Sequence, residues 1–191
     1  MAGFVDIPFD EIPIDYITGT SAGALVAGLY AAGYSPEEME AIFTSDQYVR
    51  MAQGKLEKEH IYFFKKNDAD ASWADFKLSK NQSISNVLPT NLVSPIELDY
   101  EMMAQLSGAS AAANYNFDSL FIPFRCVAAD ISAKEQVVFK TGHLNQAVRA
   151  SMSYPFYLRP IKVNGKLLFD GGLYNNFPSD VMYHDFLPDI I

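Results

Sequence analysis

The pattern of apolar and polar residues at the start of the chain predicts a strand followed by a helix. The apolar run Ile12–Ile17 is typical of a short buried strand, and Ala24–Ala32 is an uncharged stretch of small and apolar residues typical of a tightly packed helix. Between them lies Gly19-Thr20-Ser21-Ala22-Gly23, a turn with glycine on both sides of a serine. This order of strand, turn and helix indicates the start of an α/β unit.

Two further helices are predicted before the middle of the chain. One begins at Pro36 behind Ser35 as its N-cap, with Glu38 completing a capping box, and runs to about Phe43. The other begins near Ser94–Glu97, and its apolar positions at helical spacing are Leu98, Met102 and Leu106. These three side chains are therefore expected in the core.

The second half of the chain alternates strands and helices. The pattern predicts strands at Leu120–Asp130 and Glu135–Lys140, a helix at Leu144–Ser151, and a hairpin of Ile161–Val163 with Lys166–Phe169 around Asn164-Gly165. The polar region Asp46–Asn81 is interpreted as a surface excursion with irregular hairpins around Tyr62–Phe64 and Trp73–Leu78. The whole order predicts a layered α/β fold.

Length and composition are those of one globular domain over residues 1–191, with 49% hydrophobic residues. The net charge of −9 argues against binding to nucleic acid and against electrostatic docking on anionic membranes. Lipid contact through apolar residues stays open. The single cysteine, Cys126, lies in a strand-like run, so it is expected to be a buried, inert thiol and no disulfide framework exists.

The glycine-flanked serine has the context of a nucleophile elbow. In such a turn Ser21 takes a strained backbone conformation, and side chains at Gly19 and Gly23 are expected to collide with the neighbouring strand and helix. The hydroxyl is then exposed at the positive end of a helix, where backbone N–H groups stabilise negative charge on an attacked carbonyl. The alternatives are a glycine-rich turn without chemistry and a membrane span over Tyr16–Pro36. Against the span are its many glycine and polar residues and its acidic flanks.

A carboxylate ends the predicted hairpin in Asp170-Gly171-Gly172, where the glycines allow close approach of backbone. Alone, this is typical of a turn. Together with the elbow it supplies a base, because a serine hydroxyl needs one within hydrogen-bond reach, and a carboxylate can serve in a dry site. The histidines are His60, His143 and His184. A Ser-His-Asp esterase that uses His184 is the competing hypothesis, although the neighbours of this histidine are those of a solvated residue.

Gly19–Gly23 together with Asp170–Gly172 resembles the patatin-like phospholipases. The segment Ala147–Pro155 is similar to the family's helix before the acid hairpin, and Asp170–Pro178 is similar to the extended acid motif of a bacterial subgroup. The resemblance runs from about Ile12 to the C-terminus. It implies a three-layer α/β/α fold with a mostly parallel central sheet and a lipid acyl hydrolase acting on phospholipids or other fatty-acyl esters.

The resemblance also implies roles for individual residues. Ser21 would attack the ester carbonyl and form an acyl-enzyme, and Asp170 would accept the serine proton and deliver it to the leaving alcohol. The backbone N–H of Ala22 would be one oxyanion donor. No cofactor and no metal is expected, because the histidines are scattered and no cluster has ligand spacing.

The sequence departs from the family at its N-terminus. Residues 1–11 contain no glycine-rich oxyanion loop, so we expect a fold that is truncated there and has an exposed sheet edge beside the elbow. The chain would then be either a fragment of a larger enzyme or a catalytically impaired lipid-binding or scaffolding domain. Residues 188–191 are expected to begin a buried strand. The resemblance suggests a bacterial protein, which would be exported if the full chain has a signal peptide; the N-terminus of this chain does not show one. Contact with a membrane surface and the oligomeric state stay open.

Overall fold

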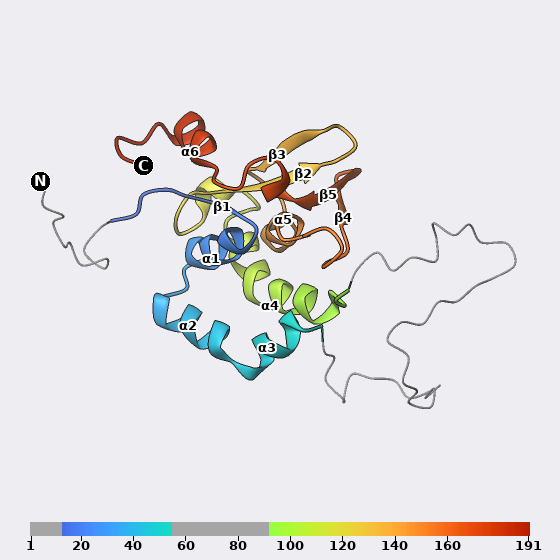
Figure 1. The fold of residues 1–191 in the computed structure, drawn as a ribbon. Coiled ribbons are helices and arrows are strands. Elements are labelled where there is room, and N and C mark those ends of the chain that lie inside the picture. Colours follow the sequence, from blue (N-terminus) through green and yellow to red (C-terminus); the bar gives the residue numbers. More distant parts are fainter. Residues whose placement is uncertain (1–12, 55–91) are drawn as a thin grey trace, which may run out of the picture.

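A five-stranded sheet forms the centre of the fold. The computed structural model describes residues 13–54 and 92–191, and Figure 1 shows the sheet between helices on both of its faces. The strands are β1 (Ile17–Thr20), β2 (Phe124–Asp130), β3 (Glu135–Phe139), β4 (Ile161–Val163) and β5 (Lys166–Asp170). Every residue of β2 is buried, as expected for a central strand.

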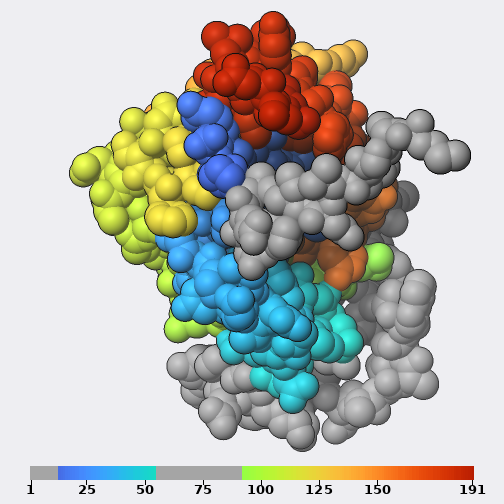
Figure 2. Space-filling view, turned by 90° about the vertical axis from the view of Figure 1, so that its left-hand side faces the viewer, coloured from blue at the N-terminus to red at the C-terminus, as the bar shows by residue number. Residues whose placement is uncertain are grey.

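The helices form two layers of unequal size. They are α1 (Ala22–Ala31), α2 (Pro36–Thr44), α3 (Asp46–Ala52), α4 (Ile96–Ala112), α5 (Leu144–Ser151) and α6 (Ser179–Phe186), with short 3-10 turns at Phe117–Ser119 and Gly171–Leu173. α1, α4 and α5 lie on one side of the sheet and α6 on the other (Figure 1). In Figure 2, α6 in red and α2 and α3 in blue to cyan lie at opposite ends of the molecule. The α/β fold class and its three layers are confirmed.

The register of β2 explains how distant parts of the chain meet. β3 pairs with one edge of β2 from Cys126 to Asp130. On the other edge, β1 runs parallel to β2 and ends with Thr20 opposite Val127, while β5 runs antiparallel and ends with Asp170 opposite Ala128. β1 and β5 therefore meet with their C-terminal ends at adjacent positions of the same strand.

The expectation of a mostly parallel sheet is wrong for the described residues, where the sheet is mixed. Only β1 and β2 pair in parallel; the pairings of β2 with β3, β2 with β5 and β4 with β5 are antiparallel. The reason is local, since short turns join β2 to β3 and β4 to β5 and force each pair to reverse direction. In the second turn Asn164 and Gly165 both have positive φ (50° and 82°), as a two-residue hairpin turn requires.

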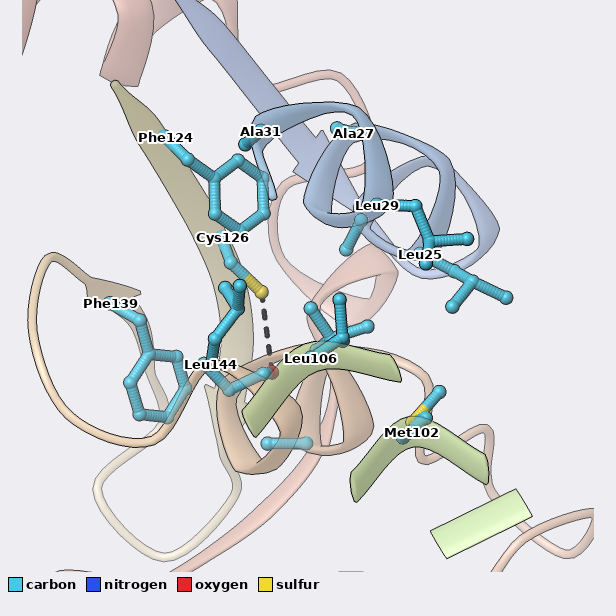
Figure 3. Close-up of a cluster of buried hydrophobic side chains, with 14 of the residues drawn as sticks. Leu25, Ala27, Leu29, Ala31, Met102, Leu106, Phe124, Cys126, Phe139 and Leu144 are labelled. Carbon is cyan, nitrogen blue, oxygen red and sulfur yellow. Dashed lines mark hydrogen bonds between the residues drawn. The ribbon is translucent and has the colours of Figure 1, made fainter. Parts of the chain in front are cut away.

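The hydrophobic core lies between the sheet and the layer of α1, α4 and α5. Figure 3 shows Phe124 and Cys126 of β2 pointing towards these helices. Leu98, Met102 and Leu106 are all buried on one face of α4, as predicted. The Cys126 thiol is buried, which confirms that prediction, and it donates a hydrogen bond to the Ala147 carbonyl oxygen (3.3 Å; dashed in Figure 3).

Several predicted elements are confirmed with their ends. α5 has the predicted bounds, and α2 begins with the predicted capping box: the Glu38 N–H donates to Ser35 Oγ (3.2 Å) and the Ser35 N–H donates to Glu38 Oε2 (2.8 Å). Among the helices that the structure describes, none combines the length and the apolar content needed to span a membrane.

Three predictions about elements are wrong. The strand predicted at Ile12–Ile17 is Ile17–Thr20 in the described part of the chain, where residues 13–16 form no strand and Ile17–Thr20 pair with β2. Asp46–Ala52 is a helix and not part of an irregular excursion, since the Ser45 hydroxyl accepts a hydrogen bond from the Tyr48 N–H and caps it. Residues 188–191 form no strand, and Ile190 is 89% exposed. The hairpins predicted around 62–64 and 73–78 lie outside the described residues.

Candidate active site

Ser21 occupies a strained turn between β1 and α1. Its φ of 57° and ψ of −126° lie in a region that non-glycine residues rarely adopt. A Cβ atom at Gly19 would lie 2.6 Å from the Gly23 carbonyl oxygen, so the turn requires glycine there. The same expectation for Gly23 is wrong: no described atom lies within 4 Å of a Cβ placed at that position. The turn is thus constrained by its first glycine only.

The hydroxyl of Ser21 points at the carboxylate of Asp170. Ser21 Oγ donates to Asp170 Oδ2 over 2.6 Å, a length typical of a hydroxyl bonded to an ionised carboxylate. The two residues are 149 positions apart in the chain and are brought together by the meeting of β1 and β5 on β2. Asp170 is 3% exposed, whereas Ser21 is half-buried, so the carboxylate is shielded from water and the serine is not fully covered.

The backbone around Asp170 fixes the carboxylate. Asp170 Oδ1 accepts from the Gly172 N–H (2.7 Å), which leaves Oδ2 for the serine, and the Asp170 N–H donates to the Ser153 carbonyl oxygen (3.0 Å). A Cβ at Gly171 would lie 2.2 Å from the Val127 carbonyl oxygen. A Cβ at Gly172 would meet Asp170 Oδ1 at 3.0 Å, so both glycines allow the close approach that the sequence predicts.

The start of α1 offers a donor next to the serine. Ala22 is the first residue of the helix and is exposed, and within the described part of the chain nothing accepts a hydrogen bond from its N–H. The first N–H groups of a helix have no partner inside the helix and lie at its positive end. This amide is therefore placed to bind an anion or an oxyanion beside Ser21.

Neither described histidine is bonded to Ser21. His143 precedes α5 and its ring packs against Tyr115 (centroids 4.9 Å apart). His184 lies in α6, where its ring packs against Tyr183 (5.6 Å). His60 lies outside the described residues. The structure places the Ser21 hydroxyl against a carboxylate, and it shows no contact between Ser21 and His184 that would support a Ser-His-Asp arrangement.

Three polar residues at the end of α5 support the site, and the sequence analysis did not single them out. Ser151 and Ser153 are completely buried and Arg149 is 3% exposed. The Ser151 hydroxyl accepts from the Ser21 N–H (2.9 Å). Arg149 donates to Ser153 Oγ (2.7 Å), to Asp99 Oδ1 (2.5 Å) and to the Arg159 carbonyl oxygen (2.9 Å). Buried polar residues in the last turn of a short helix and just after it were the available signal, because such groups are buried only when they are bonded.

An apolar pocket of about 280 Å³ lies between α1, α2, α3 and α4. Leu25 and Leu29 of α1 face Met102 and Leu106 of α4 across it, and Figure 3 shows these four side chains. Leu25, the lining residue nearest to Ser21 in the chain, is one helical turn beyond it, and Ser21 itself does not line the pocket.

Three of the polar side chains that line this pocket, Gln47, Glu101 and Gln105, have hydrogen-bond partners. The Gln47 side-chain amide donates to Glu101, and the Tyr34 hydroxyl donates to Gln105 Oε1 (2.5 Å). Burial, and then the nearby Tyr157, raise the pKa of Tyr48, which keeps this lining phenol neutral. The pocket is therefore suited to an apolar ligand.

Within the described residues no group of three or more His, Cys, Asp or Glu side chains is arranged to hold a metal ion. The thiol of Cys126 also has no role at the surface of the site, since burial raises its pKa to about 12.

Comparison with known proteins identifies relatives of the chain. The family model described as patatin-like phospholipase matches residues 8–183. A Caenorhabditis elegans protein named patatin-like phospholipase domain-containing protein ZK370.4 is 30% identical over 186 residues, which is 91% of this chain and 11% of the relative. Human patatin-like phospholipase domain-containing protein 6 is 28% identical over 179 residues, or 89% of this chain and 10% of the relative.

A bacterial relative matches a larger share of its own length. The Mycobacterium bovis protein named uncharacterized NTE family protein Mb1092c is 26% identical over 162 residues, which is 85% of this chain and 35% of the relative. The chain thus spans about a tenth of the animal relatives named above and about a third of the mycobacterial one. The bacterial subgroup, the missing glycine-rich loop and export stay predictions.

Proposed function

The chain belongs to the patatin-like phospholipase family, and on that premise we propose that it hydrolyses phospholipids or other fatty-acyl esters through a Ser21–Asp170 dyad and an acyl-enzyme. The observation that supports the dyad most directly is the 2.6 Å hydrogen bond from Ser21 Oγ to Asp170 Oδ2. A serine hydroxyl becomes nucleophilic when a base in direct contact takes its proton. Asp170 is the described base in contact with this hydroxyl.

The proposed reaction proceeds in two steps. Ser21 Oγ attacks the ester carbonyl carbon as its proton moves to Asp170 Oδ2, and the Ala22 N–H donates to the oxyanion of the tetrahedral intermediate. The intermediate collapses with cleavage of the ester C–O bond, and the Asp170 carboxyl gives the proton to the departing alcohol. A water molecule then attacks the acyl-enzyme and loses a proton to Asp170. The bond between the acyl carbon and Ser21 Oγ breaks, Asp170 returns the proton to Oγ, and the fatty acid leaves.

We infer further that the pocket between α1 and α4 takes the acyl chain. Its lining is mostly apolar, and the side chains of Gln47, Glu101 and Gln105 are held in hydrogen bonds. Leu25 places one end of the pocket a single turn from the serine, which suits a chain whose carbonyl lies at Ser21. Contact with a lipid surface is part of this proposal, because the substrates are membrane lipids.

Intact mass after incubation with a fluorophosphonate tests the dyad, because the reagent reacts much faster with an activated serine than with an ordinary one. We expect one adduct on the parent, none on Ser21→Ala, and labelling slowed by about 10² or more in Asp170→Asn, since general-base catalysis contributes 10²–10⁴-fold. Asp130→Asn is the matched control: Asp130 is also buried (4% exposed) and its Oδ1 accepts two backbone N–H groups, but it does not touch Ser21.

Each other outcome has a definite meaning. Loss of labelling in His184→Ala with normal labelling in Asp170→Asn would replace the dyad by a Ser-His-Asp arrangement. No adduct on a folded parent would refute the proposed chemistry for this chain. A lipid-binding or scaffolding domain would then be the better description, and lipid binding that survives Ser21→Ala would support it.

A further inference from the structure

The hydroxyl of Ser151 joins two backbone groups at the centre of the site. Ser151 is the last residue of α5 and is completely buried. Its Oγ accepts from the Ser21 N–H (2.9 Å) and donates to the Val127 carbonyl oxygen (2.5 Å). A serine hydroxyl can do both at once, because it has one proton to donate and lone pairs to accept.

The Ser21 N–H has a particular need for this acceptor. The pairing of β1 with β2 ends at Thr20, and Ser21 precedes the first residue of α1, so neither the sheet nor the helix supplies a partner. A residue held at φ 57° also persists in that conformation only when its surroundings fix it. The hydrogen bond to the Ser151 hydroxyl fixes the backbone of Ser21 and connects it to the end of α5.

The other end of the bridge lies at the junction of the strands. Val127 is the residue of β2 opposite Thr20, and its neighbour Ala128 is opposite Asp170. The Ser151 hydroxyl therefore connects the serine turn to the point of β2 that also sets the position of the carboxylate. A shift of this bridge would change the distance between Ser21 Oγ and Asp170 Oδ2.

We propose that Ser151 is a positioning residue for the nucleophile: its hydroxyl holds the Ser21 amide against β2 and keeps Ser21 Oγ aligned with Asp170. This inference rests on the proposed function for its effect on reactivity. The hydrogen bond itself makes a separate prediction that needs no activity. Ser151 touches neither the reacting carbonyl nor the serine hydroxyl, so its effect is on alignment.

The chain provides a matched control in Ser110. This serine is 1% exposed, and its hydroxyl also bridges two backbone groups, accepting from the Leu144 N–H (3.2 Å) and donating to the Gly142 carbonyl oxygen (3.3 Å). Ser110 lies in α4, and its hydroxyl bonds the first residue of α5, at the end of that helix opposite Ser151. Ser110→Ala therefore removes the same kind of buried hydroxyl bridge without touching the serine turn.

The experiment compares Ser151→Ala with Ser110→Ala in three measurements: Tm, the rate of fluorophosphonate labelling, and the exchange rate of the Ser21 backbone amide. Both variants should lose a similar few degrees of Tm, because each leaves buried backbone groups unpaired. Only Ser151→Ala should be labelled more slowly, by roughly tenfold to a hundredfold, since small misplacements of reacting groups have effects of that size. Only Ser151→Ala should exchange the Ser21 amide faster.

The outcomes separate this inference from the proposed function. Labelling of Ser151→Ala at the rate of Ser110→Ala would overturn the positioning role. If the parent itself is not labelled, the proposed function fails. Amide exchange still tests the Ser151 bridge in that case, because an unchanged exchange rate of the Ser21 amide in Ser151→Ala would refute it. Should Ser151→Ala not fold, Ser151→Cys and Ser110→Cys give the same comparison with a weaker donor and acceptor, and equal labelling and equal exchange in that pair would count against the proposal.

Discussion

The glycine before the serine is the position where the turn is most sensitive to a single added atom. A Cβ at Gly19 would lie 2.6 Å from the Gly23 carbonyl oxygen, 2.7 Å from its carbonyl carbon and 2.8 Å from the Ala24 Cα atom. All three are backbone atoms of the start of α1, so no side chain can rotate away. Since carbon atoms pack at about 3.5–4.0 Å, Gly19→Ala requires β1 and α1 to separate by roughly 1 Å.

The expected loss of stability follows from this overlap. Overpacking of this kind costs about 1–3 kcal/mol, and alanine in place of glycine returns about 0.4–1 kcal/mol through the unfolded chain. We expect Gly19→Ala to lower the free energy of unfolding by about 1–2 kcal/mol, or roughly 2–8 °C in Tm for a chain of this size. Because the helix start would move away from Asp170, labelling of Ser21 by a fluorophosphonate should also slow.

Gly23→Ala is the control within the same motif. No described atom lies within 4 Å of its Cβ, and the residue is in the first turn of α1. Alanine is favoured over glycine in a helix by up to about 1 kcal/mol, so this variant should be as stable as the parent or more stable. Urea unfolding of the three proteins makes the comparison. Equal stability of Gly19→Ala and the parent, or an equal loss in both variants, would refute the steric argument.

Three further predictions concern the pocket, an ion pair and the thiol. Ala41→Trp, an exposed position that lines the pocket, should lower kcat/KM for long-chain esters and spare short ones; an equal loss at every chain length would contradict the acyl site. Burial raises the pKa of Asp185, but hydrogen bonds from Lys140 and Arg125 outweigh it and hold the pKa below its usual range. Asp185→Asn should therefore cost about 1–3 kcal/mol in urea unfolding at pH 7, and the loss should shrink as the pH falls below about 4 and through the lowered pKa; a loss that does not decrease at all below pH 4 would be inconsistent with this. Because burial raises the pKa of Cys126 to about 12, its thiol should resist alkylation in the native protein and react in urea; rapid native reaction would show that it is accessible.

The sequence predicted the ends of helices and turns best where a local structure requires particular residue types. Ser35 and Glu38 predicted the start of α2, and Asn164 and Gly165 predicted the hairpin, because capping boxes and turns with positive φ need those residues. It was least informative for Asp46–Ala52, a polar segment that is helical because Ser45 caps it and Met51 is buried. Composition suggested an irregular loop there, and packing decided otherwise.

The two motifs predicted the contact between Ser21 and Asp170, but not which glycine the turn requires. Gly19 and Gly23 look equivalent in sequence, and only Gly19 is required by contact. The first strand was placed too early, because Ile12–Ile17 is the more apolar run, whereas the pairing with β2 selects Ile17–Thr20. The register of a strand depends on its partner, which no local pattern contains.

The two motifs meet at Val127 of β2. Thr20 pairs with this residue, Ser151 donates to its carbonyl oxygen (2.5 Å), and Gly171 must lack a Cβ because that atom would lie 2.2 Å from the same oxygen. Three segments far apart in the chain thus lie against the backbone of one residue. Every residue has a backbone carbonyl, so the residue type at position 127 does not reveal that its carbonyl has this role. The sequence could therefore indicate Ser21 and Asp170 separately, and the distance between them follows only from the register of β2.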